Sequence, residues 1–242
     1  MVVEDYAALS RACAGLVAAQ IAKKPNSVIG FATGSSPVGT YSELVRLHKE
    51  EGLDFSGVTS VNLDEYYPIK KSNDQSYDYF MKDQLFNHVN MNLANMYIPN
   101  GEAADIAAEC AAYEAKIEEL GGVDFQILGI GLNGHIGFNE PEPTFPAHTH
   151  LIELDPVTIE ANTRFFASKA DVPRHAITMG VGTIMAAETI MMMISGAKKA
   201  DIAKQTVLGK ITPDVPASVL QLHRNVIIVL DKDAAAALVP CL

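Results

Sequence analysis

Three short apolar runs alternate in this chain with longer segments of helical periodicity. The runs are residues 27–33 (SVIGFAT), 58–63 (VTSVNL) and 124–130 (DFQILGI). Runs that are apolar on both faces are typical of parallel strands covered by helices on both sides of a sheet. Their alternation with helical segments predicts an α/β fold with a mainly parallel central sheet.

The other predicted elements extend this alternation along the chain. Further strands are expected at residues 96–98, 175–179, 189–194 and 226–230, and helices at residues 4–24, 40–51, 73–88, 103–120, 184–188, 197–208 and 231–239. The 242 residues are 48% hydrophobic and contain no internal repeat or Pro/Ser-rich linker. That length and composition suffice for a full core. We expect residues 1–242 to form one domain, a three-layer sandwich.

The charge balance limits the partners of the protein. Asp and Glu total 29 against 18 Lys and Arg, which gives a net charge of −11. Such a surface repels nucleic acid and anionic membranes, so we expect neither as a partner. A site for an anionic ligand would have to gather its own cations and backbone N–H groups.

Three further features predict a cytoplasmic location. The first residues, MVVEDY, lack the basic and apolar regions of a signal peptide. The longest strongly apolar stretch, residues 189–194, is too short to span a bilayer. The cysteines Cys13, Cys110 and Cys241 share no C-x-x-C spacing, which favours reduced thiols over a zinc site or a disulfide framework.

The segment at residues 33–40, TGSSPVGT, connects a predicted strand to a predicted helix. Small residues let backbone N–H groups converge on an anion, and the helix N-terminus adds a favourable dipole. The segment has neither the Gly-Lys-Ser/Thr of a Walker loop nor the G-x-G-x-x-G spacing of a dinucleotide site. It is either a phosphate-binding turn or an ordinary strand-to-helix turn with Ser as the N-cap.

Two adjacent acids, Asp64 and Glu65, follow the second apolar run. A carboxylate at a strand exit can be partly buried and act as a general base, although acids in such positions are more commonly solvated turn residues. Only one of two neighbours can face a pocket. We select Asp64, the nearer to the strand end, and expect Glu65 to make a structural hydrogen bond or ion pair.

The loop after the third run, residues 129–141, reads GIGLNGHIGFNEP. It places the amide of Asn133, the imidazole of His135 and the carboxylate of Glu140 among glycines that permit tight curvature. Histidine suits proton transfer near neutral pH, and a neighbouring amide or carboxylate can orient it. Metal binding is the rival interpretation. It is weak because H-x-x-x-x-E supplies only two ligands, so we expect no metal.

Basic residues in the second half of the chain are candidates for binding an anion. Arg164 precedes a pair of phenylalanines, and Lys198 and Lys199 follow a strand exit at Ser195-Gly196. Arginine is suited to bidentate contact with phosphate. Surface charge is the competing explanation. Surface charge explains Lys169, Arg174 and Lys204 better than it explains Arg164 and Lys199.

Seven segments, in this order along the chain, resemble the glucosamine-6-phosphate deaminase (isomerase) family. They run from about Val28 to Asp231 and read GFATGSSPVGTY, SVNLDEYYP, GIGLNGHIGFNEP, ANTRFF, MGVGTIM, SGAKKA and SVLQLH. The resemblance implies a Rossmann-like α/β fold. It also implies amino-sugar catabolism, in which glucosamine 6-phosphate and water become fructose 6-phosphate and ammonia without a metal or cofactor.

The resemblance assigns roles to individual residues. Asp64 is implied to be the base that moves a proton between C2 and C1. His135 is implied to assist opening of the sugar ring, with Glu140 as its partner and Asn133 in support. The substrate phosphate is implied to bind Gly34, Ser35, Ser36, Arg164 and Lys199.

Two departures from the family pattern carry predictions. Many members have Asp where this chain has Asn133, and an amide cannot offset the charge of an imidazolium. Allosteric, hexameric members have Ser and Arg after the NEP segment and a longer C-terminal tail, whereas this chain has FPAHTH at residues 145–150 and ends at Leu242. We therefore expect no activation by N-acetylglucosamine 6-phosphate. We also expect a monomer, with a small homo-oligomer as the alternative.

Two other functions compete with the deaminase. A 6-phosphogluconolactonase would share the broad fold, but the Asp64-Glu65 pair and the FNEP ending favour the deaminase, and release of ammonia separates the two. A sugar-phosphate-sensing regulator would carry a DNA-binding helix-turn-helix, for which this chain has neither the length nor a basic patch.

Overall fold

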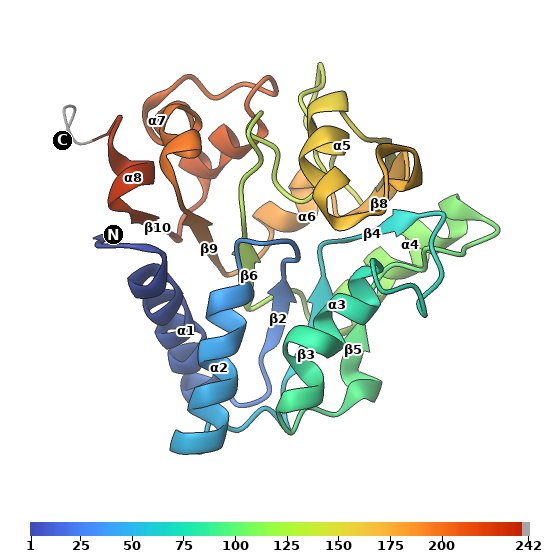
Figure 1. Ribbon diagram of the computed structural model, residues 1–242. Helices are drawn as coiled ribbons and strands as arrows, with labels where there is room; N and C mark the ends of the chain where they lie inside the picture. Colours follow the sequence, from blue (N-terminus) through green and yellow to red (C-terminus); the bar gives the residue numbers. More distant parts are fainter. Residues whose placement is uncertain (239–242) are drawn as a thin grey trace.

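The computed structural model describes residues 1–238 and contains two sheets (Figure 1). The larger sheet has the strand order β1-β10-β9-β6-β2-β3-β5, and each neighbouring pair is parallel. Its strands are β1 (Val2–Val3), β2 (Val28–Phe31), β3 (Thr59–Asn62), β5 (Met96–Tyr97), β6 (Phe125–Leu128), β9 (Thr189–Ile194) and β10 (Val226–Asp231). The predicted α/β fold with a mainly parallel central sheet is confirmed.

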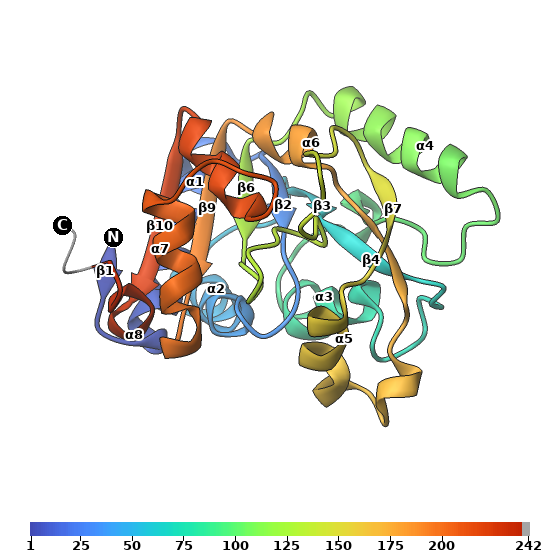
Figure 2. The same ribbon diagram turned by 90° about the horizontal axis from the view of Figure 1, so that it is seen from above.

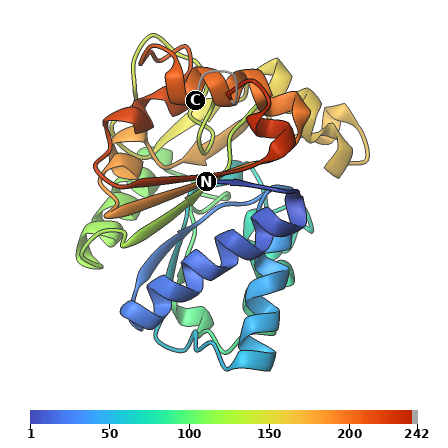
Figure 3. The ribbon, with the colours of Figure 1, turned by 90° about the vertical axis from the view of Figure 1, so that its left-hand side faces the viewer.

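Helices cover both faces of this sheet, as Figure 3 shows. Helices α1 and α2 pack together on one face, and α7 and α8 pack together on the other. The helices are α1 (Tyr6–Lys23), α2 (Val38–Glu51), α3 (Tyr77–Gln84), α4 (Ile106–Glu119), α5 (Pro156–Asn162), α6 (Val181–Met185), α7 (Ala200–Leu208) and α8 (Lys232–Ala235). The predicted three-layer arrangement is therefore present.

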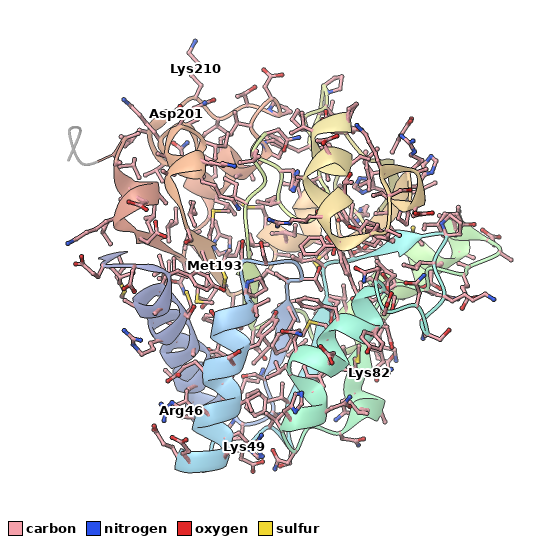
Figure 4. The ribbon with its side chains drawn as sticks, in the orientation of Figure 1. Arg46, Lys49, Lys82, Met193, Asp201 and Lys210 are labelled. Carbon is pink, nitrogen blue, oxygen red and sulfur yellow. The ribbon has the colours of Figure 1, made fainter. Side chains whose placement is uncertain are left out.

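The core consists of the strand centres and the helix faces that cover them. Ile29 of β2 and Ile127 of β6 are fully buried. Met193 of β9 lies inside the molecule in Figure 4, whereas Arg46 projects outward from α2. Arg46 pairs there with acids of its own helix, Glu43 and Glu50 among them. Burial on both faces explains why the parallel strands are recognisable in the sequence as continuous apolar runs.

The smaller sheet corrects the sequence interpretation. It is antiparallel, with the order β4-β8-β7, and consists of β4 (Asp64–Tyr67), β7 (His150–Glu153) and β8 (His175–Thr178). Residues 64–67 carry no predicted strand, whereas residues 175–179 are predicted to be a strand of the mainly parallel sheet. Both expectations are wrong, and β7 was not predicted.

Several helix boundaries also differ from prediction. The helix expected at residues 73–88 begins only at Tyr77, because the Ser76 hydroxyl accepts the N–H of Tyr79 as an N-cap. The helix expected at residues 184–188 lies at Val181–Met185 instead.

Val239, the end of the last predicted helix, and Cys241 lie outside the described residues. Cys13 and Cys110 are buried free thiols. Within residues 1–238, no helix has the length and apolar character to cross a membrane.

The strand order places a topological switch point between β2 and β6. From β2 the chain continues to β3 and β5 on one side, and from β6 to β9 and β10 on the other. Ligands of open α/β sheets bind in the crevice outside the carboxyl ends of strands at such a point. Viewed from above in Figure 2, β2 and β6 lie between α7 on one side and α5 on the other.

Candidate active site

A cleft of about 1030 Å³ lies at this switch point. All of the predicted site residues except Glu140 line it: Gly34, Ser35, Ser36, Asp64, Asn133, His135, Arg164 and Lys199. They come from the exits of β2, β3, β6 and β9 and from the segment after α5. Folding thus brings together residues that are up to 165 positions apart, since Gly34 and Lys199 share one cleft.

One end of the cleft gathers positive charge around the turn after β2. Gly34 adopts φ +85°, a conformation that favours glycine. An Nη atom of Arg164 donates to the Ser35 hydroxyl at 2.9 Å, and the ammonium of Lys199 donates to the carbonyl of Ile130. Two cations beside a small-residue turn suit an anion such as a phosphate monoester. Within residues 1–238, neither Arg164 nor Lys199 forms an ion pair with a carboxylate, so both charges are available to a ligand.

Lys199 should make phosphate binding depend on pH. Burial, followed by the nearby charge of Arg164, lowers the pKa of Lys199 to about 8. Below that pH the ammonium is present, and above it the site loses one positive charge. We expect the inhibition constant of inorganic phosphate to rise roughly tenfold between pH 7.5 and 9. The variant Lys199→Arg should abolish this dependence because guanidinium stays charged. A flat profile in the unmodified protein would contradict the assignment.

Asp64 also lines the cleft and is only 5% exposed. It opens β4, where it faces Thr178 of β8 across the antiparallel pair. Burial, together with the charge of Glu65, raises the pKa of the Asp64 carboxyl well above its usual range. A carboxyl group stripped of water in this way is a stronger proton acceptor when ionised, as a general base requires.

The loop that carries His135 passes close to Asp64. A Cβ atom on Gly137 would come within 3.4 Å of Asp64 Oδ2 and 2.9 Å of Thr178 Oγ1, and Gly137 has φ +58°. Any side chain at this position would therefore be strained and crowded. Glycine lets the loop pass over the carboxyl and brings the acid and the histidine loop into one site.

Glu65 points away from the cleft, as the alternation of a strand requires. It is 1% exposed, and its carboxylate accepts the N–H groups of Tyr66, Tyr77 and Asp78. The last two open α3, so Glu65 anchors the helix N-terminus to β4. The expected structural hydrogen bonding of Glu65 is confirmed.

His135, Glu140 and Asn133 form a compact hydrogen-bonded group. Glu140 Oε2 lies 3.1 Å from His135 Nδ1 and accepts the Asn133 side-chain amide at 2.7 Å. Burial opposes ionisation of Glu140, but hydrogen bonds from His135, Thr158 and Asn133 hold its pKa below the usual value. An ionised Glu140 fixes the proton of His135 on Nδ1, which leaves Nε2 as the acceptor. A Cβ on Gly131 would lie 2.3 Å from the imidazole, so glycine is required there too.

Three residues that the sequence did not single out also line the cleft: Tyr6, Tyr77 and Thr158. Thr158 Oγ1 lies 3.4 Å from His135 Nδ1, and it reaches the site on α5, a helix without a distinct prediction. The ring of Tyr77 stacks on Phe138 with an interplanar angle of 11°. No local sequence pattern identifies these residues, because their contacts are made with distant parts of the chain.

Within residues 1–238, no three His, Cys, Asp or Glu side chains gather as metal ligands would.

The fold and the cleft define a Rossmann-like α/β protein with an anion-binding end and a carboxylate–imidazole end in one site. Residues 4–229 match the family model of glucosamine-6-phosphate isomerases and 6-phosphogluconolactonases. The chain therefore belongs to this family, and within it to the glucosamine-6-phosphate deaminases, as its relatives show. The resemblance identified in the sequence is confirmed.

The similar proteins are matched over nearly their whole length. A glucosamine-6-phosphate deaminase of Clostridioides difficile (strain 630) is 53% identical over 240 residues, which cover 99% of this chain and 96% of the relative. The solved structure of a monomeric glucosamine-6-phosphate deaminase of the NagB superfamily superimposes with a TM-score of 0.96 at 43% identity, covering 98% of both chains. The structure of a 6-phosphogluconolactonase from Leishmania guyanensis superimposes with a TM-score of 0.76 at 19% identity and shares the fold. The match covers 97% of this chain and 96% of the lactonase.

Proposed function

We propose that the protein is a glucosamine-6-phosphate deaminase, which converts glucosamine 6-phosphate and water to fructose 6-phosphate and ammonia. One observation carries the proposal. A buried carboxyl, Asp64, and an imidazole held by a carboxylate share one cleft with a turn flanked by Arg164 and Lys199. The relatives at 49–53% identity that bear the deaminase name support it.

The cationic end of the cleft supplies positioning. Ser35, Arg164 and Lys199, with the backbone of residues 34–36, bind the phosphate of the substrate. This contact is remote from the reacting carbons, so its binding energy serves to orient C1 and C2 over Asp64. The chemistry then requires proton transfers and the hydrolysis of an imine by water, for which the proposal uses neither metal nor cofactor.

Ring opening is the task of His135. Its Nε2 takes the proton of the anomeric hydroxyl and returns a proton to the ring oxygen, while Glu140 stabilises the imidazolium that forms in between. Asn133 contributes by donating to the same Glu140 oxygen, which holds the carboxylate in place. The product of this step is the open-chain amino aldehyde.

Asp64 carries out the transfer between the two carbons. The ionised carboxylate removes the proton from C2 while the ammonium group on C2 passes a proton to the carbonyl oxygen of C1, which gives an enolamine with a hydroxyl on C1. The carboxylic acid then returns the C2 proton to C1. The nitrogen at C2 is now an imine, which water hydrolyses to the ketone as ammonia leaves. Burial suits Asp64 to both halves of this cycle, because a raised pKa brings the acid and the base forms closer in free energy.

The direct test is an assay of the purified protein for fructose 6-phosphate and ammonia formed from glucosamine 6-phosphate. Stoichiometric formation of both supports the proposal. Hydrolysis of 6-phosphogluconolactone without ammonia release would replace it with the lactonase alternative. That alternative is weaker, because the lactonase structures are only 17–20% identical in sequence to this chain and support a shared fold alone.

We extend the proposal to the setting of the enzyme. It acts as a hydrolase in amino-sugar catabolism, where it serves the utilisation of N-acetylglucosamine. It works in the cytoplasm as a monomer without a nucleic-acid partner. Supporting observations are the buried free thiols Cys13 and Cys110, the net charge of −11 and the monomeric state named for the similar solved structure.

Initial rates should follow a hyperbolic dependence on glucosamine 6-phosphate and should not change when N-acetylglucosamine 6-phosphate is added. Allosteric activation needs a second site with differential affinity for two states. The segment at residues 145–150, FPAHTH, offers histidines but no arginine to bind such an anion. Rate curves recorded with and without the effector check this. A sigmoidal curve that the effector makes hyperbolic would refute it.

A further inference from the structure

Tyr6 lies at the rim of the cleft although it is the first residue of helix α1. The Asp5 carboxylate accepts the N–H of Ala8 at 2.8 Å, and this N-cap fixes the first turn of the helix. The Ser10 hydroxyl donates to the Tyr6 carbonyl at 2.8 Å. The backbone from which the tyrosine ring projects is thus well anchored.

The hydroxyl of Tyr6 contacts both the turn after β2 and the first turn of helix α2. It accepts the N–H of Gly39 at 2.9 Å and lies 3.2 Å and 3.1 Å from the carbonyl oxygens of Ser35 and Ser36, to which it can donate. Helix α2 has Pro37 at its N-cap position and no side-chain cap of its own. Tyr6 therefore caps α2 from outside the helix, a role normally taken by a residue of the helix itself.

Close packing keeps the ring in this position. A Cβ on Gly39 would lie 3.0 Å from Tyr6 Cε1 and 2.3 Å from Ser10 Oγ, so α2 approaches α1 here as closely as glycine allows. The turn at residues 34–36 is held between this contact and Arg164, which donates to the Ser35 hydroxyl.

The contact with Ser35 also orients a backbone donor. In a planar trans peptide the carbonyl and the following N–H point in opposite directions. Because the Ser35 carbonyl is directed at Tyr6, the N–H of Ser36 points away from Tyr6. Release of the carbonyl would let this peptide rotate, and the turn would then lose the fixed N–H that anion binding requires.

We propose that Tyr6 is a positioning residue of the phosphate subsite, which holds the turn at residues 34–36 in its anion-binding conformation before the ligand arrives. The inference rests on the proposed function for the identity of the substrate, a phosphate monoester. It does not place Tyr6 in contact with the reacting carbons. The expected signature is therefore a loss of binding without a loss of turnover, since a preorganised site binds with less ordering cost.

The test is Tyr6→Phe, which removes only the hydroxyl. We expect KM for glucosamine 6-phosphate and the dissociation constant of inorganic phosphate, measured by calorimetry, to rise together by roughly 5- to 10-fold. The value of kcat should stay within about twofold, since Asp64 and His135 are untouched. Tyr79→Phe, at a tyrosine of α3 that is 44% exposed, is the matched control and should change neither constant.

Unchanged phosphate affinity in Tyr6→Phe would overturn the inference, and so would a fall in kcat at constant KM. Thermal unfolding of both variants shows whether the effect arises from a loss of folded protein, which would also overturn it. The phosphate titration needs no turnover. If the protein released no ammonia, the proposed function would fail while the role of Tyr6 could still be decided.

Discussion

Replacement of Asp64 by Asn should lower kcat by roughly 10²- to 10⁴-fold, while KM stays within a few-fold of its original value. The amide has the shape of the carboxyl but cannot accept the C2 proton. Glu65 cannot substitute for it because Glu65 points into the α3 N-terminus, and Glu140 is occupied by His135 and Asn133. Glu160, which also lines the cleft, is paired with Lys169. A coupled assay for fructose 6-phosphate measures the effect.

The stability of this variant should move in the opposite direction to its activity. Burial raises the pKa of Asp64, so ionisation of this carboxyl is less favourable in the folded protein than in the unfolded chain. The contribution of Asp64 to stability is therefore lost as the pH rises above the pKa that this carboxyl has in the unfolded chain. A neutral Asn avoids that cost, and Asp64→Asn should unfold at the same or a higher temperature near pH 7. Such a trade between stability and activity is common for catalytic groups.

The neighbouring acid provides the matched comparison. Glu65→Gln places an amide N–H₂ against the backbone donors of Tyr66, Tyr77 and Asp78, so one or more buried donors lose their acceptor. It should lower the unfolding temperature and leave kcat much closer to that of the unmodified protein. If Asp64→Asn retained full turnover, or if Glu65→Gln were the inactive variant, the base would be wrongly assigned.

The parallel sheet could be predicted because its signal is local. Residues 28–31 and 125–128 are fully buried, and burial of both faces leaves a continuous apolar run that is visible in the sequence. The polar segments that follow these runs had to meet at one edge of the sheet. The candidate site was therefore predictable from the point where each strand ends, before the order of the strands was known.

The second sheet could not be predicted in the same way. Strand β4 reads DEYY, with two acids and two aromatics, and it pairs with β8 more than 100 residues later in the sequence. That pairing is what turns Asp64 into the cleft and Glu65 toward α3. The sequence selected the acid that lines the cleft, but the antiparallel pairing that separates the two side chains depends on a distant partner.

The same limit applies to the residues that surround the predicted site. Thr158 reaches His135 from α5, and Tyr6 reaches the turn after β2 from α1. Neither side chain has a local pattern that distinguishes it from a surface residue of an amphipathic helix. Their roles follow from how helices pack over the cleft, which is settled by tertiary contacts.

Glu140→Gln should lower kcat/KM by roughly 10²- to 10³-fold. The Oε2 atom of Glu140 receives both His135 Nδ1, at 3.1 Å, and the Asn133 amide, at 2.7 Å. A glutamine can accept these hydrogen bonds only through its one carbonyl oxygen, and it carries no charge to stabilise the imidazolium formed during ring opening. Initial rates with glucosamine 6-phosphate measure the loss.

Two comparisons assign that loss to ring opening. Asn133→Ala removes one donor to Glu140 but keeps the carboxylate, so its effect should be no more than about tenfold. The open-chain polyol 2-amino-2-deoxyglucitol 6-phosphate needs no ring opening, and it should bind Glu140→Gln as tightly as it binds the unmodified protein. If the polyol also lost affinity by a factor similar to the fall in kcat/KM, Glu140 would be acting on the shape of the cleft and not through His135. If Asn133→Ala were as inactive as Glu140→Gln, the amide and not the charge of the carboxylate would be what holds the imidazole in its working orientation.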